Sequence, residues 1–492
     1  MKGLWETVKK DTVLSTGEFA GEISDLTKRV KNIVRLTLRF TKLESDPESL
    51  IDAHCSIAKS FSGVPELRQM WIEKVSKLHD RYQNFSEAGM CHVLIAAIMS
   101  MTLKRKGIIP EGPAIFKNVT PNISVNDVNF KEDALSDENT HCVSTFITQI
   151  NIACDFFFKA ERYELLPDLC KIIIPLLEKE DNYKGLADTY IKLKNTYEKI
   201  IERAHKRFLG TYYRVSFYGH GFKEEHGCGY IYKEPKLTYL PEVVQRLKNI
   251  YSPSCPNLTI VQESTKLRWK ELDHESNYIQ INAVKPNYMD KTQDSKSQFL
   301  SHHNIGSFIM ETPFSLTGKA HGQVTDQCKR ITVFTTAQTF PSIKKRILIL
   351  KKEVSELSPI EVAIEEMSAQ VHGLKMLIDS EKIDKVQLEL KLQGSISTTV
   401  NAGPLAYAEA FLKTEVRSKF EKNLIAKLIS IFKQFLDACE KALEIYAINI
   451  SDVQIPVLKR YRDDLASFQK DIFKILDIQP KPHQQSTVET II

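Results

Sequence analysis

The chain has 492 residues, of which 42% are hydrophobic and 26% are charged, so an ordinary globular protein with two or three domains is expected. Its net charge of +5 is small for this length and argues against a dedicated nucleic-acid-binding protein. Nine cysteines without a C-x-x-C pair predict reduced thiols in a cytoplasmic protein, and no window approaches the ~18 apolar residues of a membrane span.

Residues 1–205 have the spacing of amphipathic helices. Apolar residues recur there at intervals of three and four, as in Leu67, Trp71, Val75 and Leu78. Turns at 84–88 and 181–185 predict hairpins stacked like degenerate tetratricopeptide repeats, with a polar loop over 107–140. Such an array either associates with another chain or only supports the next domain, and the residues leave both uses open.

From residue 206 to 350 the hydrophobic period changes to two. Segments that alternate aromatic or apolar with polar residues follow one another: TYYRVSFYG, GYIYKEP, NYIQINAVKP, SFIMETPF and CKRITVFTTAQTFP. One predicted helix, LTYLPEVVQRLKNIY, interrupts a lobe of mainly antiparallel sheets. The glycines here do not form a phosphate-binding loop, and the histidines lack further ligands at metal spacing, so no metal site is expected.

Residues 351–478 return to a helical period. Ser358, Pro359 and Glu361 form a capping box with proline at the first helical position, which predicts a helix start. A stripe suited to an antiparallel helix bundle follows: Ile360, Ile364, Met367, Val371, Leu374 and Ile378. The polar tail 479–492 is predicted to be disordered. The predicted fold class is therefore mainly α with a β-rich middle domain, in the order helical array, antiparallel sheet lobe and helix bundle.

The stretch LKLQGSISTTVNAGPLAYAEAFL, residues 390–412, interrupts one of these helices. Gly394 is unfavourable inside a helix, and Gly403-Pro404 breaks one. The residues between them are β-branched or hydroxylated and form helices poorly. A loop over 395–401, inserted in the second helix of the bundle, is predicted. Spacing alone favours an ordinary connection between two helices, because most loops only connect elements.

Three motifs, SPIEVAIEEM, LKLQGSIS and VNAGPLAYAEAFL, resemble the catalytic DOCK homology region two of the dedicator-of-cytokinesis family. Members of that family are guanine nucleotide exchange factors for Rho GTPases. The resemblance implies that the inserted loop enters the nucleotide site of the GTPase. It also implies that Val400 is a nucleotide sensor that excludes Mg²⁺, with Asn401 acting beside it. The remaining residues expected to bind the GTPase are Ser395, Ile396, Ser397, Thr398, Thr399, Gly403 and Pro404.

The same resemblance implies further partners. The helical array would carry a homodimer interface, and the sheet lobe would contact the first switch of the GTPase. The stretches YIYKEPKLTYLPEVVQRL and QCKRITVFTTAQTFP are similar to the zizimin-type branch, which favours the cell-division-cycle type of Rho GTPase, with Rac second. Family members are several times longer and have an upstream phosphoinositide-binding domain that nothing here matches. Recruitment to a membrane is therefore expected from other regions or partners.

The sequence contains no hydrolytic triad, paired-carboxylate site or cofactor fingerprint, so neither a cofactor nor covalent chemistry on a small molecule is expected. The alternative to an exchange factor is a non-catalytic helical scaffold that binds a small GTPase or another partner. At the C-terminus, Thr490 and Ile492 have the spacing that a PDZ domain reads, with a hydroxyl two places before an apolar terminal residue.

Overall fold

The computed structural model describes residues 18–128, 130, 141–203, 207–235, 237–263, 271–287, 299–318, 323–379, 384–396, 403–448 and 454–477. The molecule divides into two compact units: unit 1 is Met1–Met310 with Val333–Glu353, and unit 2 is Glu311–Thr332 with Val354–Ile492. Helices at both ends of the chain with an antiparallel sheet between them confirm the predicted fold class at that level. The predicted boundary at residue 205 lies inside unit 1, and the three-lobe division stays a prediction.

Unit 1 begins with the helical array. Its helices are α2 (Glu18–Thr37), α3 (Phe40–Leu43), α4 (Pro47–Ser60), α5 (Pro65–Arg81), α6 (Phe85–Arg105), η1 (Gly112–Asn118), α7 (Val125–Val128), α8 (Val143–Lys159), α9 (Leu165–Lys179) and α10 (Tyr183–Arg203). The short helices η1 and α7 occupy part of the stretch 107–140, which the sequence predicted to be a loop. The tetratricopeptide-like pairing stays a prediction.

Helix α6 is the centre of the array. It packs between α5 and α8, and nearly all of its side chains are buried. By length and composition it could cross a membrane, although the sequence reading found no such window. In the structure 94% of its apolar window is buried inside the protein. Its apolar character therefore comes from its place in the core.

The β-rich part of the chain follows the array. Its elements are β1 (Thr211–Tyr218), η3 (His220–Glu225), β2 (Gly229–Glu234), α11 (Leu240–Tyr251), β3 (Leu258–Val261), β4 (Asn277–Pro286), η5 (Leu300–His302), β5 (Ile305–Ser315), β6 (Gln327–Phe340) and β7 (Arg346–Leu357). The strand order is β1-β2-β7-β6-β5-β4-β3, and β1 also pairs with β4, so six antiparallel strands close into a barrel. Strand β3 pairs with β4 in parallel outside the ring.

Alternate residues of β1 face two different cores, as period two requires. Val215 and Phe217 pack with residues of α11 on one face, including Leu247. On the other face Tyr212 packs against Phe308, with ring centroids 5.0 Å apart. The alternation of aromatic and polar residues in the sequence predicts one exposed face for β1. In the structure both faces of the strand are covered, so more of its side chains are buried than the pattern suggests.

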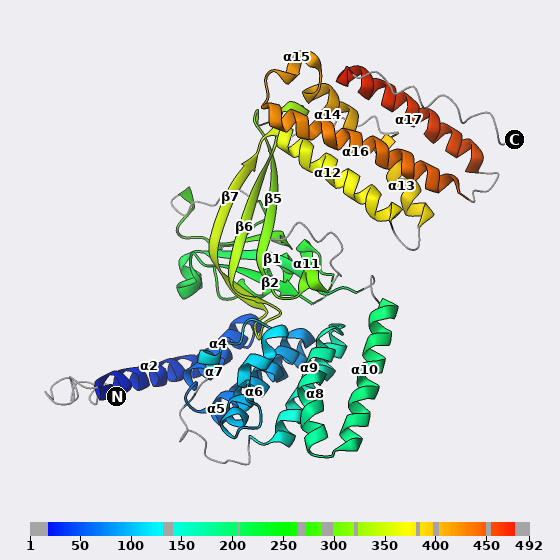
Figure 1. The fold of residues 1–492 in the computed structure, drawn as a ribbon. Helices are drawn as coiled ribbons and strands as arrows, with labels where there is room; N and C mark the ends of the chain where they lie inside the picture. The colour runs from blue at the N-terminus through cyan, green and yellow to red at the C-terminus, as the bar shows by residue number, and fades with distance from the viewer. Residues whose placement is uncertain are drawn as a thin grey trace. The chain divides into compact units, whose positions relative to one another are not determined.

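Buried charges join the array to the barrel. Lys233 Nζ on β2 lies 2.5 Å from Glu87 Oε1 on α6, and both side chains are at most 2% exposed. Arg246 on α11 pairs with Glu48 of α4 at 2.5 Å and with Glu234 of β2 at 2.6 Å. Within unit 1, Figure 1 shows the helices of the array on one side of the strands that carry these partners.

Unit 2 contains η6 (Val324–Asp326), α12 (Pro359–Ile378), α13 (Lys385–Ile396), α14 (Pro404–Phe411), α15 (Thr414–Arg417), α16 (Lys422–Ala447) and α17 (Ile455–Leu476). Figure 1 shows these helices together in unit 2. Apart from α15, they share one apolar core, to which α16 contributes Leu428, Phe432 and Phe435. The capping box predicted for α12 is present, since Glu361 Oε2 accepts hydrogen bonds from Ser358 N–H at 2.8 Å and from its hydroxyl at 2.6 Å.

Candidate functional site

Helix α13 leads into the candidate loop. It starts at Lys385 and is preceded by Asp384, whose Oδ1 accepts hydrogen bonds from the N–H groups of Val386 at 3.1 Å and Gln387 at 3.2 Å. Leu388, Leu392 and Ile396 follow at intervals of four, which places them on one face of the helix, and all three are buried in the core of unit 2. The start of α13 and its inner face are therefore well determined.

The helix continues two residues beyond its predicted end. Ser395 and Ile396 form its last turn, whereas the sequence analysis placed them in the loop. Their side chains are buried, and the Ser395 hydroxyl has no hydrogen-bond partner among the described residues. The prediction that these two residues belong to the loop is therefore wrong, whereas their contact with a GTPase stays a prediction. Burial of Ile396 offsets the low helix propensity of Gly394 and Ser395.

Helix α14 begins on the far side of the loop. Pro404 occupies the first turn, as predicted, and is buried together with Tyr407 and Phe411. The Tyr407 hydroxyl donates a hydrogen bond to Glu366 of α12. Burial and this bond raise the pKa of Tyr407. Gly403 precedes the helix with φ −125° and ψ 178°, an extended backbone that other residues also adopt, so its conformation does not require glycine.

The centre of the predicted site lies outside the described residues: Ser397, Thr398, Thr399, Val400 and Asn401, as do the PDZ-like residues Thr490 and Ile492. The six residues 397–402 connect two helix ends that belong to the same core. Helices α13 and α14 each pack on α12 and α17.

Sequence reasoning missed a second apolar face on α13. In KVQLELKL apolar residues alternate at every second position, which on a helix distributes them over two faces. Leu388 and Leu392 face the core, whereas Val386 and Leu390 are 67% and 63% exposed. The alternation was the available signal. Val386 and Leu390 therefore form a second, solvent-exposed apolar face on the helix that leads into the loop.

Among the described residues, no group of three or more His, Cys, Asp or Glu side chains could hold a metal ion. Around the loop the arrangement offers buried helix ends, an exposed apolar pair and the Tyr407–Glu366 bond. These features support binding by surface contact.

Three family models match the chain in separate stretches. DHR-2, Lobe A matches residues 52–202, DHR-2, Lobe B matches 264–339, and DHR-2, Lobe C matches 373–475. The segment 397–402 falls within the Lobe C match.

Curated relatives match nearly the whole chain. Dedicator of cytokinesis protein 11 of Danio rerio is 40% identical over 475 residues, which cover 95% of this chain and 23% of the relative. Dedicator of cytokinesis protein 9 of Mus musculus is 38% identical over 496 residues, which cover 95% of this chain and 24% of the relative. The chain thus spans about a quarter of the length of these relatives. For protein 9 of Rattus norvegicus the identity is 34%, and 69% of the relative is covered. The chain belongs to the dedicator-of-cytokinesis (DOCK) family and matches all three lobes of its DHR-2 region.

Proposed function

We propose that this chain is the catalytic part of a guanine nucleotide exchange factor for a Rho-family GTPase. The observation that carries the proposal is the match to all three DHR-2 lobes, combined with a short segment, 397–402, whose two ends are anchored in the core of unit 2. An exchange factor needs no covalent chemistry. It accelerates GDP release by binding the GTPase better without nucleotide than with it.

Val400 is the proposed sensor. Mg²⁺ bridges the GDP phosphates to the GTPase, and its loss removes the largest positive charge that holds the nucleotide. An apolar, β-branched side chain inserted at the ion's position excludes Mg²⁺ sterically and offers it no ligand. Asn401 beside it can exchange hydrogen bonds with polar groups that the ion leaves. The anchored ends at Ile396 and Pro404 limit the entropy lost when the segment docks.

The exposed pair Val386 and Leu390 is the proposed first contact of unit 2 with the GTPase. Both side chains lie on the helix that leads into the segment. Burying them against a partner removes apolar surface from water, which favours the complex by roughly 25 cal/mol per Å² before the costs of association. Similarity to proteins named dedicator of cytokinesis 9 and 11 supports the zizimin-type assignment, with the cell-division-cycle type of GTPase as favoured substrate and Rac second.

The test is the release of a fluorescent GDP analogue from the cell-division-cycle GTPase, followed by stopped flow. We expect Val400→Ala to slow release in the presence of Mg²⁺ and to approach the wild-type rate when Mg²⁺ is chelated. Val125→Ala, which truncates an exposed valine on α7, is the matched control. Equal rates for wild type and Val400→Ala at every Mg²⁺ concentration would refute the sensor role. A stable complex without accelerated release would favour the scaffold alternative.

The array is proposed to carry a homodimer interface along α10. Tyr183, Tyr190 and Tyr197 recur every seven residues on this helix, and each is at least 50% exposed. A heptad stripe of aromatic residues matches the seam between two packed helices. Light scattering should therefore detect a dimer that becomes a monomer in the Tyr190→Asp, Tyr197→Asp double variant. Leu316→Asp, which changes an exposed apolar residue of unit 2, should leave the dimer intact. A monomeric wild type at micromolar concentration would contradict the proposal.

A further inference from the structure

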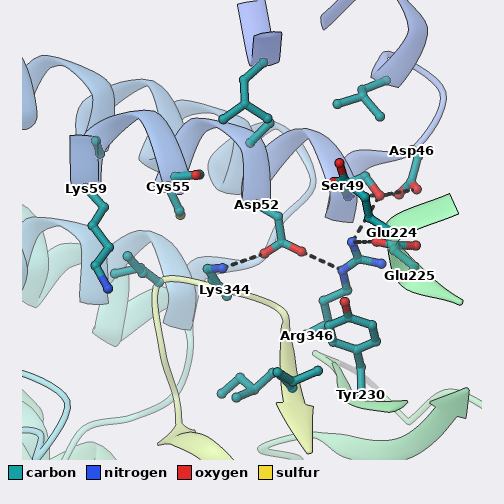
Figure 2. Close-up of a pocket in the computed structure, with 18 of the residues that line it drawn as sticks. Asp46, Ser49, Asp52, Cys55, Lys59, Glu224, Glu225, Tyr230, Lys344 and Arg346 are labelled. Atoms are coloured by element: carbon teal, nitrogen blue, oxygen red, sulfur yellow. Dashed lines mark hydrogen bonds and ion pairs between the residues drawn. The ribbon is translucent and has the colours of Figure 1, made fainter. Parts of the chain in front are cut away.

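A cleft of about 1410 Å³ lies within unit 1, away from the residues used above. Its walls come from α2, α4, η3, the end of α11 and the start of β7. Figure 2 shows α4 along the top, with Lys344 and Arg346 of the barrel reaching toward Asp52. Asn32 Nδ2 of α2 lies 3.2 Å from Ser56 Oγ and 3.1 Å from Ser60 Oγ, and these bonds hold α2 against α4.

The cleft has an excess of positive charge. Eight lysine and arginine side chains line it, against five aspartates and glutamates, which leaves three positive charges without a counter-charge in the lining. The inner cations are paired. Asp52 lies 3.0 Å from Lys344 Nζ and 2.7 Å from Arg346 Nε, and Glu225 lies 2.5 Å from Arg346 Nη2. These buried pairs position the barrel against α4 and are not available to a ligand.

The cations nearer the solvent have fewer acidic partners than positive charges. Arg35 and Arg39 share a single carboxylate, Glu224, at 2.8 Å and 3.7 Å, and the three side chains are between 41% and 64% exposed. Exposed pairs of this kind contribute only about 0–1 kcal/mol, so another anion can replace Glu224 at little cost. Arg29 and Lys59 line the same cleft, and their side chains make neither a hydrogen bond nor an ion pair with any residue that the structure describes.

Lys223 is the fifth outer cation, and its backbone is strained. It lies at φ 51° and ψ −112° inside η3, next to Glu224. A lysine in this sparsely populated region costs on the order of 1–3 kcal/mol, and such residues cluster at binding sites. The strained residue Lys223 thus lines the cleft, and its ammonium group has no ion-pair partner among the described residues.

We propose that this cleft binds a small molecule that carries at least two phosphate groups. Arginine matches phosphate through two parallel N–H···O bonds. One phosphate monoester carries about −1.5 to −2 charge at pH 7, so two of them balance the excess of three positive charges. The volume exceeds the roughly 300–1,000 Å³ of an ordinary small-molecule pocket, which leaves room for the scaffold that joins the phosphates. A free polyphosphorylated compound and a phospholipid headgroup share this chemistry.

Calorimetric titration of the full chain with inositol hexakisphosphate and with inorganic pyrophosphate tests the proposal. We expect saturable binding that weakens by roughly tenfold in Arg29→Ala, Lys59→Ala, because charge-assisted hydrogen bonds are lost. Glu224→Gln should strengthen binding, since it frees Arg35 and Arg39. Lys171→Ala, which removes an exposed lysine of α9 outside the cleft, is the control and should bind like wild type.

Vesicles distinguish the two sources of phosphate. A lipid headgroup is supported if the chain binds phosphatidylcholine vesicles that contain a bisphosphorylated inositol lipid and inositol hexakisphosphate competes with this binding. A free ligand is supported if the chain binds only the soluble compound. Absence of binding to both soluble probes at physiological ionic strength would overturn the proposal. So would equal weakening by Lys171→Ala, weaker binding in Glu224→Gln, or tighter binding of a glutamate-rich peptide than of either probe. The variants should keep wild-type exchange rates, which separates this proposal from the proposed function.

Discussion

The junction between array and barrel in unit 1 differs from the core of unit 2 in what holds it together. At the junction, charged side chains such as Lys233 and Glu87 are buried and paired. In unit 2 the carboxylates of the ion pairs Lys329–Glu365, Arg330–Glu356 and Lys413–Glu409 are at least 39% exposed, and the core between the helices consists of aliphatic and aromatic side chains. Hydrogen-bonded ion pairs depend on direction, so they fix the position of the helices against the sheet. Apolar contact does not depend on direction, so an apolar core can accommodate a helix that is interrupted. The interrupted helix lies in the apolar unit.

The largest expected effect comes from breaking one buried pair in unit 1. Glu87→Gln leaves the Lys233 ammonium without its counter-charge, which should destabilise unit 1 by about 3–5 kcal/mol. Chemical denaturation followed by tryptophan fluorescence measures this effect selectively, because Trp5, Trp71 and Trp269 all belong to unit 1. Glu87→Gln combined with Lys233→Met should recover most of the loss. A single variant within experimental error of wild type would show that the pair is not what holds the junction.

The corresponding change in unit 2 is Leu392→Ala. Removing this fully buried side chain from α13 should cost about 2–5 kcal/mol through lost burial and the remaining cavity. The loss should appear in the far-ultraviolet circular dichroism transition and not in tryptophan fluorescence. Leu390→Ala, two residues away and 63% exposed, should stay within ±0.5 kcal/mol while slowing nucleotide exchange. Equal stability losses for both variants would contradict the two-faced description of α13.

Acid should weaken the junction before it weakens the core of unit 2. Burial alone would raise the pKa of Glu48, but Lys345 and Arg246 outweigh burial and lower it from 4.5 to about 2. A depressed carboxyl pKa contributes stability above pH 4.5 that is lost as the pH falls toward 2, here on the order of 3 kcal/mol. The fluorescence-detected free energy of unfolding should fall over that range. In Glu48→Gln this part of the pH dependence should be absent, and an unchanged slope would disprove the assignment.

The smallest expected changes in stability come from replacing a helical glycine by alanine, and their sign should differ between two positions. A Cβ at Gly394 would meet no atom within 4 Å among the described residues outside its own helix backbone. Because the residue is helical, Gly394→Ala should stabilise unit 2 by about 0.5–1 kcal/mol. A Cβ at Gly89 in α6 would lie 2.7 Å from Phe157 Cε1, so Gly89→Ala should destabilise unit 1 instead. Thermal unfolding of the two variants compares them directly. Destabilisation by Gly394→Ala would mean that the end of α13 needs glycine for a reason other than space.

Local sequence determined the features that depend on neighbouring residues. The capping box at Ser358 and Glu361, the restart of a helix at Pro404 and the alternation in β1 each follow from side-chain chemistry within a few positions. The change from helical to strand period near residue 206 was likewise readable, and it correctly predicts helical ends and an antiparallel sheet between them.

Only the tertiary structure decided the features that depend on distant residues. Closure of the barrel through β1 and β4, and the pairing of Glu87 with Lys233, join positions far apart in the chain. Burial against α12 and α17 carries α13 through Gly394 to Ile396, although local propensity favours an earlier end. Propensities differ by less than about 1 kcal/mol per residue, whereas burying a side chain such as Ile396 contributes about 1.5–3 kcal/mol, so packing sets the helix end.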